Sequence, residues 1–268
     1  MFGTLYECKG DNVLTPYLQR SHMKIALITG ANKGLGIATA RLLGQSGAKV
    51  LIGARDAANG EQAVRELRGE QIDAEALTLD VTDQASVQAA ARKVEREHGR
   101  LDILVNNAGI LPEATDGDQA DGPLDLRMFR DTFETNVFGA VSVTQACLPL
   151  LEKSDGGRIV NVSSRMGSLT DQADPASPWY ALPVPAYRAT KAALNSITIG
   201  LSKSLVDTKI KVNAICPGWV QTDLGGPQNR ADAPLTADEA ARIVVEMALL
   251  SDDGPTGHFV HANGTARW

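Results

Sequence analysis

From residue 24 onward the chain alternates short apolar runs with longer stretches whose apolar residues recur at helical spacing. Such alternation is typical of parallel strands joined by helices. The apolar runs are almost continuous, as strands require when helices cover both faces of their sheet. We therefore predict a doubly wound α/β fold with a parallel sheet of about seven strands. The predicted strands are residues 24–29, 48–53, 73–80, 101–106, 157–164, 209–216 and 257–262, and the predicted helices are 36–47, 57–70, 83–99, a long helix ending near Glu152, 187–205 and 236–250.

The pattern begins only after residue 22. Residues 1–22 show no sustained strand or helix period and lack the apolar centre of a signal peptide. Ser21-His22-Met23 resembles a junction left by an expression vector, with Met23 as the natural start. We expect residues 1–22 to be a vector-derived leader and residues 23–268 to form one Rossmann-type domain. The alternative is that residues 1–22 are a genuine N-terminal arm.

Composition excludes several function classes. The net charge of −6 argues against general binding to nucleic acid or to anionic membranes. No apolar run reaches the roughly 18 residues that a membrane span needs. Cys8, Cys147 and Cys216 are too few and too scattered for a disulfide framework or a metal site. We expect three unpaired thiols, no metal and a cytoplasmic protein.

A glycine-rich turn, Thr29 to Gly36, lies between the first predicted strand and the first predicted helix. Glycines permit a tight turn and leave room for a phosphate, and the helix N-terminus then offers free N–H groups. A plain connecting turn is the alternative. The strand before the turn and the helix after it favour a dinucleotide site.

The end of the second strand indicates which dinucleotide. An NAD site carries an acidic residue there, whereas an NADP site carries a cation for the 2′-phosphate. The strand ends Gly53-Ala54-Arg55, and Lys33 in the glycine-rich turn could supply a second cation. Either residue alone could be an ordinary surface charge. Their joint placement favours NADP(H).

Tyr187 and Lys191 are four residues apart at the start of a predicted helix, so they share one face. An ammonium beside a phenol lowers the phenol's pKa towards the range useful for proton transfer. Ser164 ends the fifth predicted strand, where it could bind a substrate oxygen or simply start a turn. Asn136 lies inside the long predicted helix, where a buried amide bonded to backbone is the alternative to a functional role.

These residues belong to motifs that occur in a characteristic order. The motifs are TGANKGLG at 29–36, NNAG at 106–109, ETNVFG around Asn136, VNVSS at 160–164, YRATK at 187–191 and PGWVQTD at 217–223. Together they resemble the short-chain dehydrogenase/reductase family over nearly all of residues 23–268. The glycine-rich turn, the ARD after the second strand and the CPGWV segment are most similar to the NADPH-dependent carbonyl reductases of that family.

The resemblance implies a role for each catalytic residue. Tyr187 would be the general acid in reduction and the general base in oxidation, and Ser164 rather than Ser163 would hold the substrate oxygen. Lys191 would bind the nicotinamide ribose and lower the pKa of Tyr187. Asn136 would position a water that links Lys191 to solvent. The cofactor NADP(H) would be held by Gly30, Asn32, Lys33, Gly34, Leu35, Gly36, Arg55, Asp80, Val81, Asn107, Ala108, Gly109, Tyr187, Lys191, Pro217, Gly218, Val220 and Thr222.

The segment 165–186 departs from the family pattern. Twenty-two residues separate Ser164 from Tyr187, more than in many members, and four prolines stiffen the loop. The loop could cover the face through which most relatives dimerise, so both a monomer and a homo-oligomer stay open. Trp179 could line the substrate pocket or anchor the loop, and Trp219 is the more plausible pocket residue by location.

The resemblance predicts an enzyme that reduces a ketone or aldehyde to an alcohol with NADPH. One alternative is an NADP-linked alcohol or steroid dehydrogenase running towards oxidation, because the same residues serve both directions. Another is a catalytically silent NADP(H)-binding sensor. Such relatives usually lack the Tyr or the Lys, whereas Asn136, Ser164, Tyr187 and Lys191 are all present here. The expected partner is a small-molecule carbonyl or alcohol.

Overall fold

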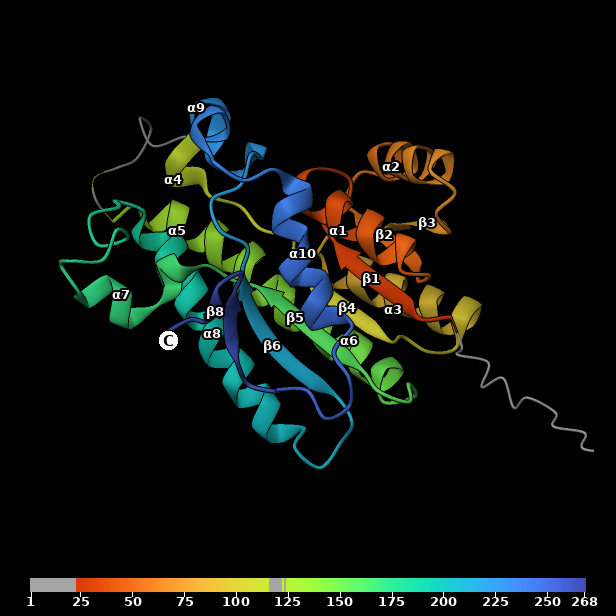
Figure 1. Ribbon diagram of the computed structural model, residues 1–268. Coiled ribbons are helices and arrows are strands. Elements are labelled where there is room, and N and C mark those ends of the chain that lie inside the picture. The colour runs from red at the N-terminus through yellow and green to blue at the C-terminus, as the bar shows by residue number, and fades with distance from the viewer. Residues whose placement is uncertain (1–22, 116–121, 123) are drawn as a thin grey trace, which may run out of the picture.

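A mostly parallel sheet forms the centre of the protein in a computed structural model that describes residues 23–115, 122 and 124–268 (Figure 1). The expected leader 1–22 lies outside the described residues. Eight strands are found within those ranges, in the order β3-β2-β1-β4-β5-β6-β7-β8. They are β1 (Ile25–Thr29), β2 (Lys49–Ala54), β3 (Ala74–Thr78), β4 (Ile103–Asn106), β5 (Arg158–Val162), β6 (Lys211–Cys216), β7 (Phe259–His261) and β8 (Gly264–Thr265).

Strands β1 to β7 are parallel, and β8 pairs with β7 in the antiparallel sense. The doubly wound fold is thus confirmed, with one strand beyond the seven runs seen in the sequence. β8 has only two residues and follows a tight turn, so it has no apolar run to reveal it. The strand order reverses between β1 and β4, and in such sheets ligands bind at the carboxyl ends of the strands beside this point.

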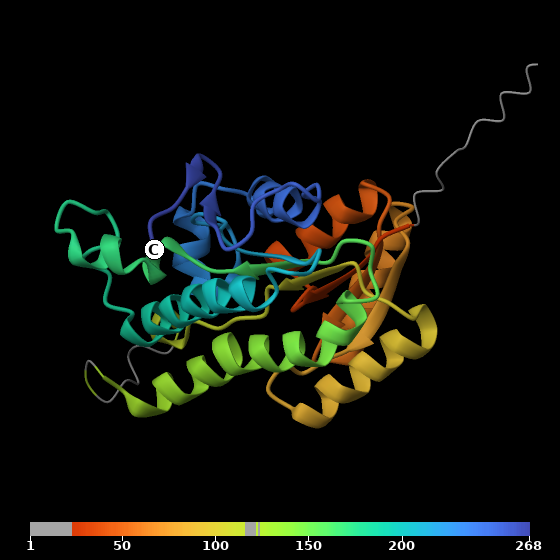
Figure 2. The ribbon, with the colours of Figure 1, turned by 90° about the horizontal axis from the view of Figure 1, so that it is seen from below.

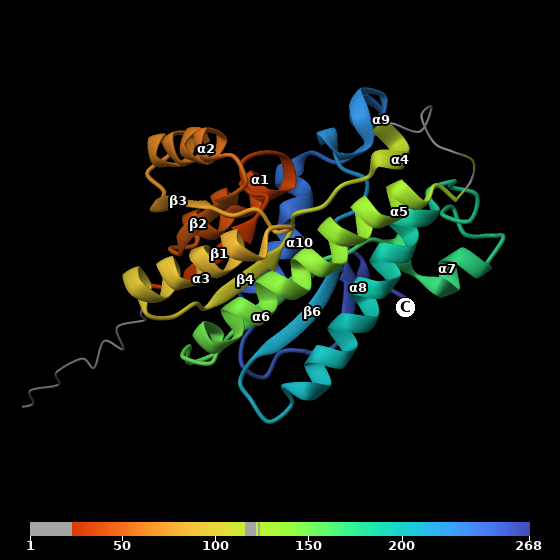
Figure 3. The same cartoon turned by 180° about the vertical axis from the view of Figure 1, so that it is seen from behind.

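Helices cover both faces of the sheet, as the continuous apolar strands require. α1, α2 and α10 pack on one face through side chains such as Leu43, Val64 and Val244. α3, α6 and α8 cover the other face, which Figures 2 and 3 show from below and from behind. The helices are α1 (Gly34–Gln45), α2 (Ala57–Gly69), α3 (Gln84–His98), α4 (Pro112–Thr115), α5 (Leu126–Phe133), α6 (Ala140–Leu151), α7 (Leu169–Ala173), α8 (Pro185–Ser204), α9 (Gly226–Asp232) and α10 (Ala237–Ala248). No helix in these described ranges is long and apolar enough to cross a membrane.

The long helix expected to end near Glu152 is interrupted. α5 and α6 are joined by a π-helical turn, η2 (Glu134–Gly139), that contains Asn136. π-turns within α-helices are often found at functional sites. The turn leaves no mark in the hydrophobic period, so the sequence predicted an unbroken helix.

The segment 165–186 forms a short 3₁₀ turn, η3 (Arg165–Gly167), then α7 and a proline-containing loop. The Arg188 guanidinium holds this loop, since Nη1 donates to the carbonyls of Tyr180 at 3.1 Å and Leu182 at 3.0 Å. The loop is therefore tied to α8 directly beside Tyr187.

Candidate active site

The glycine-rich turn runs from the end of β1 into α1. Gly30 and Gly34 have φ of +63° and +56°, a conformation that favours glycine. A Cβ on Gly36 would lie 2.5 Å from the carbonyl oxygen of Gly30, so no larger residue fits there. Asn107 supports the turn, because its Nδ2 donates to the Thr29 carbonyl at 2.8 Å and to the Gly30 carbonyl at 3.2 Å.

The N-terminus of α1 is suited to a phosphate. The residue that precedes the helix, Lys33, provides no side-chain cap. The first N–H groups of α1 therefore have no side-chain cap and, with the positive end of the helix dipole, can bind an anion. Thr222 stands opposite, since a Cβ on Gly34 would lie 3.2 Å from its Cγ2. This cradle fits the pyrophosphate of a dinucleotide.

The two cations expected at the 2′-phosphate have different surroundings. Arg55 is exposed directly after β2. The pKa of Asp80 is lowered mainly by hydrogen bonds from Thr82, and the charge of Arg55 adds a smaller lowering. Lys33 is engaged, because its Nζ lies 2.9 Å from Asp223 Oδ2. A 2′-phosphate could therefore bind the exposed Arg55 directly, but would have to compete with Asp223 for Lys33.

Tyr187 and Lys191 occupy the first turns of α8 and are both buried, with 6% and 5% of their surfaces exposed. Lys191 Nζ lies 5.4 Å from the centroid of the Tyr187 ring. It also donates a hydrogen bond of 2.8 Å to the carbonyl of Val162 at the end of β5. The expected placement of the two side chains on one helix face is observed.

Burial controls the protonation of this pair. Desolvation raises the pKa of the Tyr187 phenol, with a smaller contribution from the Cys216 thiol, and a hydrogen bond with Ser164 only partly opposes it. Desolvation also lowers the pKa of Lys191 to about 8. The sequence argument expected the ammonium to lower the pKa of Tyr187, whereas burial of the phenol shifts this pKa upward. At neutral pH the phenol is protonated and able to donate a proton.

The two serines after β5 face different partners. The Ser163 hydroxyl lies 2.6 Å from Asn195 Oδ1 and is buried. The Ser164 hydroxyl is hydrogen-bonded with Tyr187 and accepts from the Met166 N–H at 3.2 Å. The structure thus brings Ser164 rather than Ser163 to the phenol.

Asn136 is fixed by the segment that follows β4. Its Oδ1 accepts from the Ile110 N–H at 2.8 Å, and its Nδ2 donates to the Ile110 carbonyl at 3.0 Å and to Thr190 Oγ1 at 3.3 Å. The side-chain oxygen and nitrogen of Asn136 are therefore both hydrogen-bonded to protein atoms, as expected if Asn136 is a buried amide bonded to backbone. Its expected role, to position a water that links Lys191 to solvent, stays a prediction.

The other expected cofactor residues lie at carboxyl ends of strands or just beyond them. Asp80 and Val81 follow β3, Ala108 and Gly109 follow β4, and the segment 217–222 follows β6. Gly218, with φ +89°, turns the chain after Pro217. The contacts of all the expected residues with a cofactor stay predictions: Gly30, Asn32, Lys33, Gly34, Leu35, Gly36, Arg55, Asp80, Val81, Asn107, Ala108, Gly109, Tyr187, Lys191, Pro217, Gly218, Val220 and Thr222.

The two candidate pocket tryptophans are placed differently. Trp219 is half-exposed, and its indole N–H donates to Asn229 Oδ1 of α9. Trp179 lies in the loop before α8, and its indole Nε1 is buried without a hydrogen-bond partner among the described residues. Neither placement establishes a substrate contact.

Two residues at the site were not identified from the sequence. Glu113 of α4 accepts hydrogen bonds from the Ala186 and Tyr187 N–H groups at 2.7 and 2.8 Å. Cys216, at the end of β6, is a buried free thiol that interacts electrostatically with Tyr187 and Lys191. The position of Cys216 before Pro217 could have signalled its location, whereas nothing in the sequence marks Glu113.

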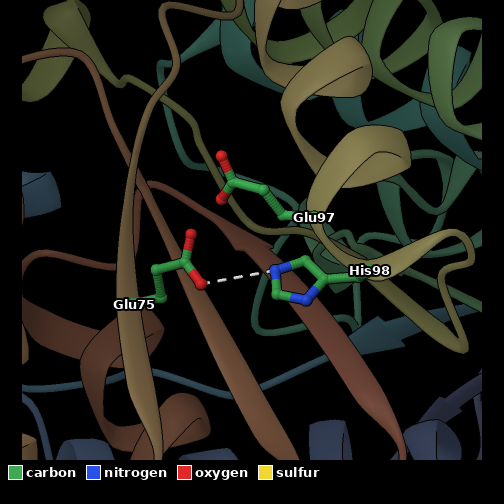
Figure 4. A group of neighbouring side chains, drawn as sticks. All are labelled: Glu75, Glu97 and His98. Atoms are coloured by element: carbon green, nitrogen blue, oxygen red, sulfur yellow. Dashed lines mark ion pairs between the residues drawn. The ribbon is translucent and has the colours of Figure 1, made fainter.

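One group of described side chains contains three possible metal ligands, Glu75, Glu97 and His98 (Figure 4). It lies at the outer strand β3 and the end of α3, away from the carboxyl ends of β1 and β4. Its charge is already compensated, because Lys93 Nζ lies 3.0 Å from Glu75 Oε1 and 3.8 Å from Glu97 Oε2. We assign no metal to it.

The amino-acid sequence is also similar to those of known proteins. Residues 24–233 match the family described as short chain dehydrogenase. The chain is 32% identical to salutaridine reductase of Papaver bracteatum, across 88% of this chain and 94% of that protein. It is 32% identical to carbonyl reductase (NADPH) 1 of Sus scrofa, across 92% and 95%.

The fold is also similar to that of a solved structure. The NADPH-bound carbonyl reductase from chicken fatty liver superposes with a TM-score of 0.76 at 29% identity, covering 92% of this chain and 99% of that one. The fold, the order of motifs and the buried Tyr187–Lys191 pair agree with this similarity. The chain therefore belongs to the short chain dehydrogenase family of oxidoreductases and, within it, resembles the carbonyl reductases.

Proposed function

We propose that the protein reduces a ketone or aldehyde to an alcohol with NADPH. The observation that carries this proposal is the buried Tyr187 phenol, which is hydrogen-bonded with Ser164, lies one helical turn from Lys191 and has its pKa raised by burial. A neutral phenol at this place is a proton donor, which is the form that reduction needs. The carbonyl reductases and salutaridine reductase among the relatives support the same direction.

The residues divide the chemistry as follows. When bound, NADPH supplies the hydride that forms the new C–H bond at the carbonyl carbon. Ser164 and Tyr187 hold the carbonyl oxygen, and Tyr187 gives its proton to that oxygen as negative charge develops on it. Lys191 binds the nicotinamide ribose and, with Asn136, belongs to the route that returns a proton to Tyr187. The product is a neutral alcohol.

The preference for the phosphorylated cofactor rests on Arg55 and Lys33. No acidic residue ends β2, and a guanidinium can bind a phosphate through two parallel hydrogen bonds. The NADPH named for the relatives supports this choice. The cytoplasm is the proposed location, since Cys147 and Cys216 are both free.

The experiment that tests this function is NADPH oxidation measured against ketones, aldehydes and quinones. We expect turnover with at least one class and little turnover with NADH. The reverse assay, NADP⁺ with secondary alcohols over the same pH range, compares the directions. Absence of turnover in both assays, with NADPH still bound, would favour the sensor alternative.

A further inference from the structure

The helix that carries Tyr187 begins without a cap of its own. The residue before α8 is Val184, which has no side chain able to cap it, and Pro185 occupies the first helical position. The N–H groups of Ala186 and Tyr187 therefore have no partner within the helix. Both residues are buried, so leaving these donors unpaired would be costly.

Glu113 supplies the missing partners from outside the helix. Oε1 accepts from the Ala186 N–H at 2.7 Å and Oε2 accepts from the Tyr187 N–H at 2.8 Å. A carboxylate on two successive N–H groups at a helix N-terminus combines charge-assisted hydrogen bonds with a favourable dipole interaction. The backbone of the proposed proton donor is thus held by a residue 74 positions earlier.

The segment that carries Glu113 also contacts two other parts of the site. Ile110 is hydrogen-bonded to Asn136 through both its backbone groups. Ala114 lies beside Gly226, where a Cβ would be 3.6 Å from the Ala114 carbonyl oxygen. Residues 110–115 therefore link the π-turn, the start of α8 and the segment after β6.

We propose that Glu113 is a positioning residue that fixes the first turn of α8 and thereby places Tyr187. Its two hydrogen bonds set the position of the phenol against Ser164. The catalytic part of this inference rests on the proposed function, whereas the structural part does not.

The test compares Glu113→Gln and Glu113→Ala with Asp131→Asn, which removes an equal charge from an exposed site on α5. Two quantities are measured: amide hydrogen exchange at Ala186 and Tyr187, and kcat for reduction together with KM for NADPH. We expect faster exchange at both amides in the Glu113 variants and wild-type exchange in Asp131→Asn.

The catalytic readout separates positioning from general structure. We expect kcat for reduction to fall about tenfold in Glu113→Ala, with KM for NADPH little changed, because only the proton donor is displaced. A folded Glu113→Gln with wild-type amide exchange would overturn the inference, and so would parallel losses of kcat, NADPH binding and melting temperature. If Glu113→Ala does not fold, amide exchange and kcat of Glu113→Gln test the inference. If the wild type shows no turnover, the proposed function fails, but amide exchange still tests the hydrogen bonds of Glu113.

Discussion

The Lys33 ammonium lies 2.9 Å from the Asp223 carboxylate and joins the glycine-rich turn to the segment after β6. Arg230 of α9 binds the other oxygen of Asp223 at 2.8 Å. Hydrogen bonding and charge from Lys33, followed by Arg230, lower the pKa of Asp223 and keep it ionised. The pair is exposed, so water screens it and a phosphate can compete for Lys33.

The variant Asp223→Asn should release Lys33 for the cofactor phosphate. Exposed ion pairs are worth up to about 1 kcal/mol, so we expect KM for NADPH to fall by about two- to fivefold. KM for NADH should change little, because NADH has no 2′-phosphate. Steady-state kinetics with both cofactors measures this, and Arg230→Gln is the control. A rise in KM for NADPH would show that Asp223 supports the cofactor site instead.

Arg55 is expected to make the larger contribution to cofactor choice. Hydrogen bonds to charged groups contribute about 1.5–3 kcal/mol, so Arg55→Ala should raise KM for NADPH by about 10- to 100-fold. KM for NADH should stay close to the wild-type value. Arg65→Ala, which removes an exposed arginine from α2, is the matched control. Equal effects of Arg55→Ala on both cofactors would rule out the phosphate role.

The pH dependence of reduction should report Lys191. Its pKa is lowered to about 8, so the ammonium is present below pH 8 and is lost as the pH rises through that value. We therefore expect kcat/KM for reduction to decline above about pH 8, since this ratio reports groups of the free enzyme. Lys191→Arg keeps its charge at high pH. An active Lys191→Arg enzyme with the wild-type decline would assign that decline to another group.

Gly36 tests the packing of the glycine-rich turn. In Gly36→Ala the new Cβ would lie 2.5 Å from the Gly30 carbonyl oxygen and 2.7 Å from Asn107 Nδ2. We expect the free energy of unfolding to fall by about 1–3 kcal/mol, with weaker NADPH binding. Gly69→Ala is the control, because no described residue outside its own stretch of α2 lies within 4 Å of its added Cβ. Denaturant unfolding measures both variants, and equal stability of Gly36→Ala and wild type would contradict the packing argument.

The fold could be predicted from the sequence because buried strands and amphipathic helices have different periods. The same reasoning missed features that leave no period, namely the two-residue strand β8 and the π-turn at Asn136. The strand β8 depends on where the chain turns after β7. The π-turn depends on contacts with other segments, such as the hydrogen bond between Ile110 and Asn136.

Part of the site could also be predicted. The spacing of Tyr187 and Lys191 determines a shared helix face, and the motif order indicated Ser164 beside them. The direction of the Tyr187 pKa shift could not be predicted, because it depends on how fully the fold encloses the phenol. Glu113 was missed because its partners are backbone N–H groups far along the chain.

The most direct test of the proposed reaction is the rate of NADPH oxidation by Tyr187→Phe, measured with a carbonyl substrate that the wild type reduces. General-acid catalysis contributes about 10²- to 10⁴-fold, so we expect a loss of that size with NADPH affinity within a few-fold of wild type. Removal of the hydroxyl leaves the ring and its packing in place. Turnover by Tyr187→Phe close to that of the wild type would contradict the assignment of Tyr187 as the proton donor.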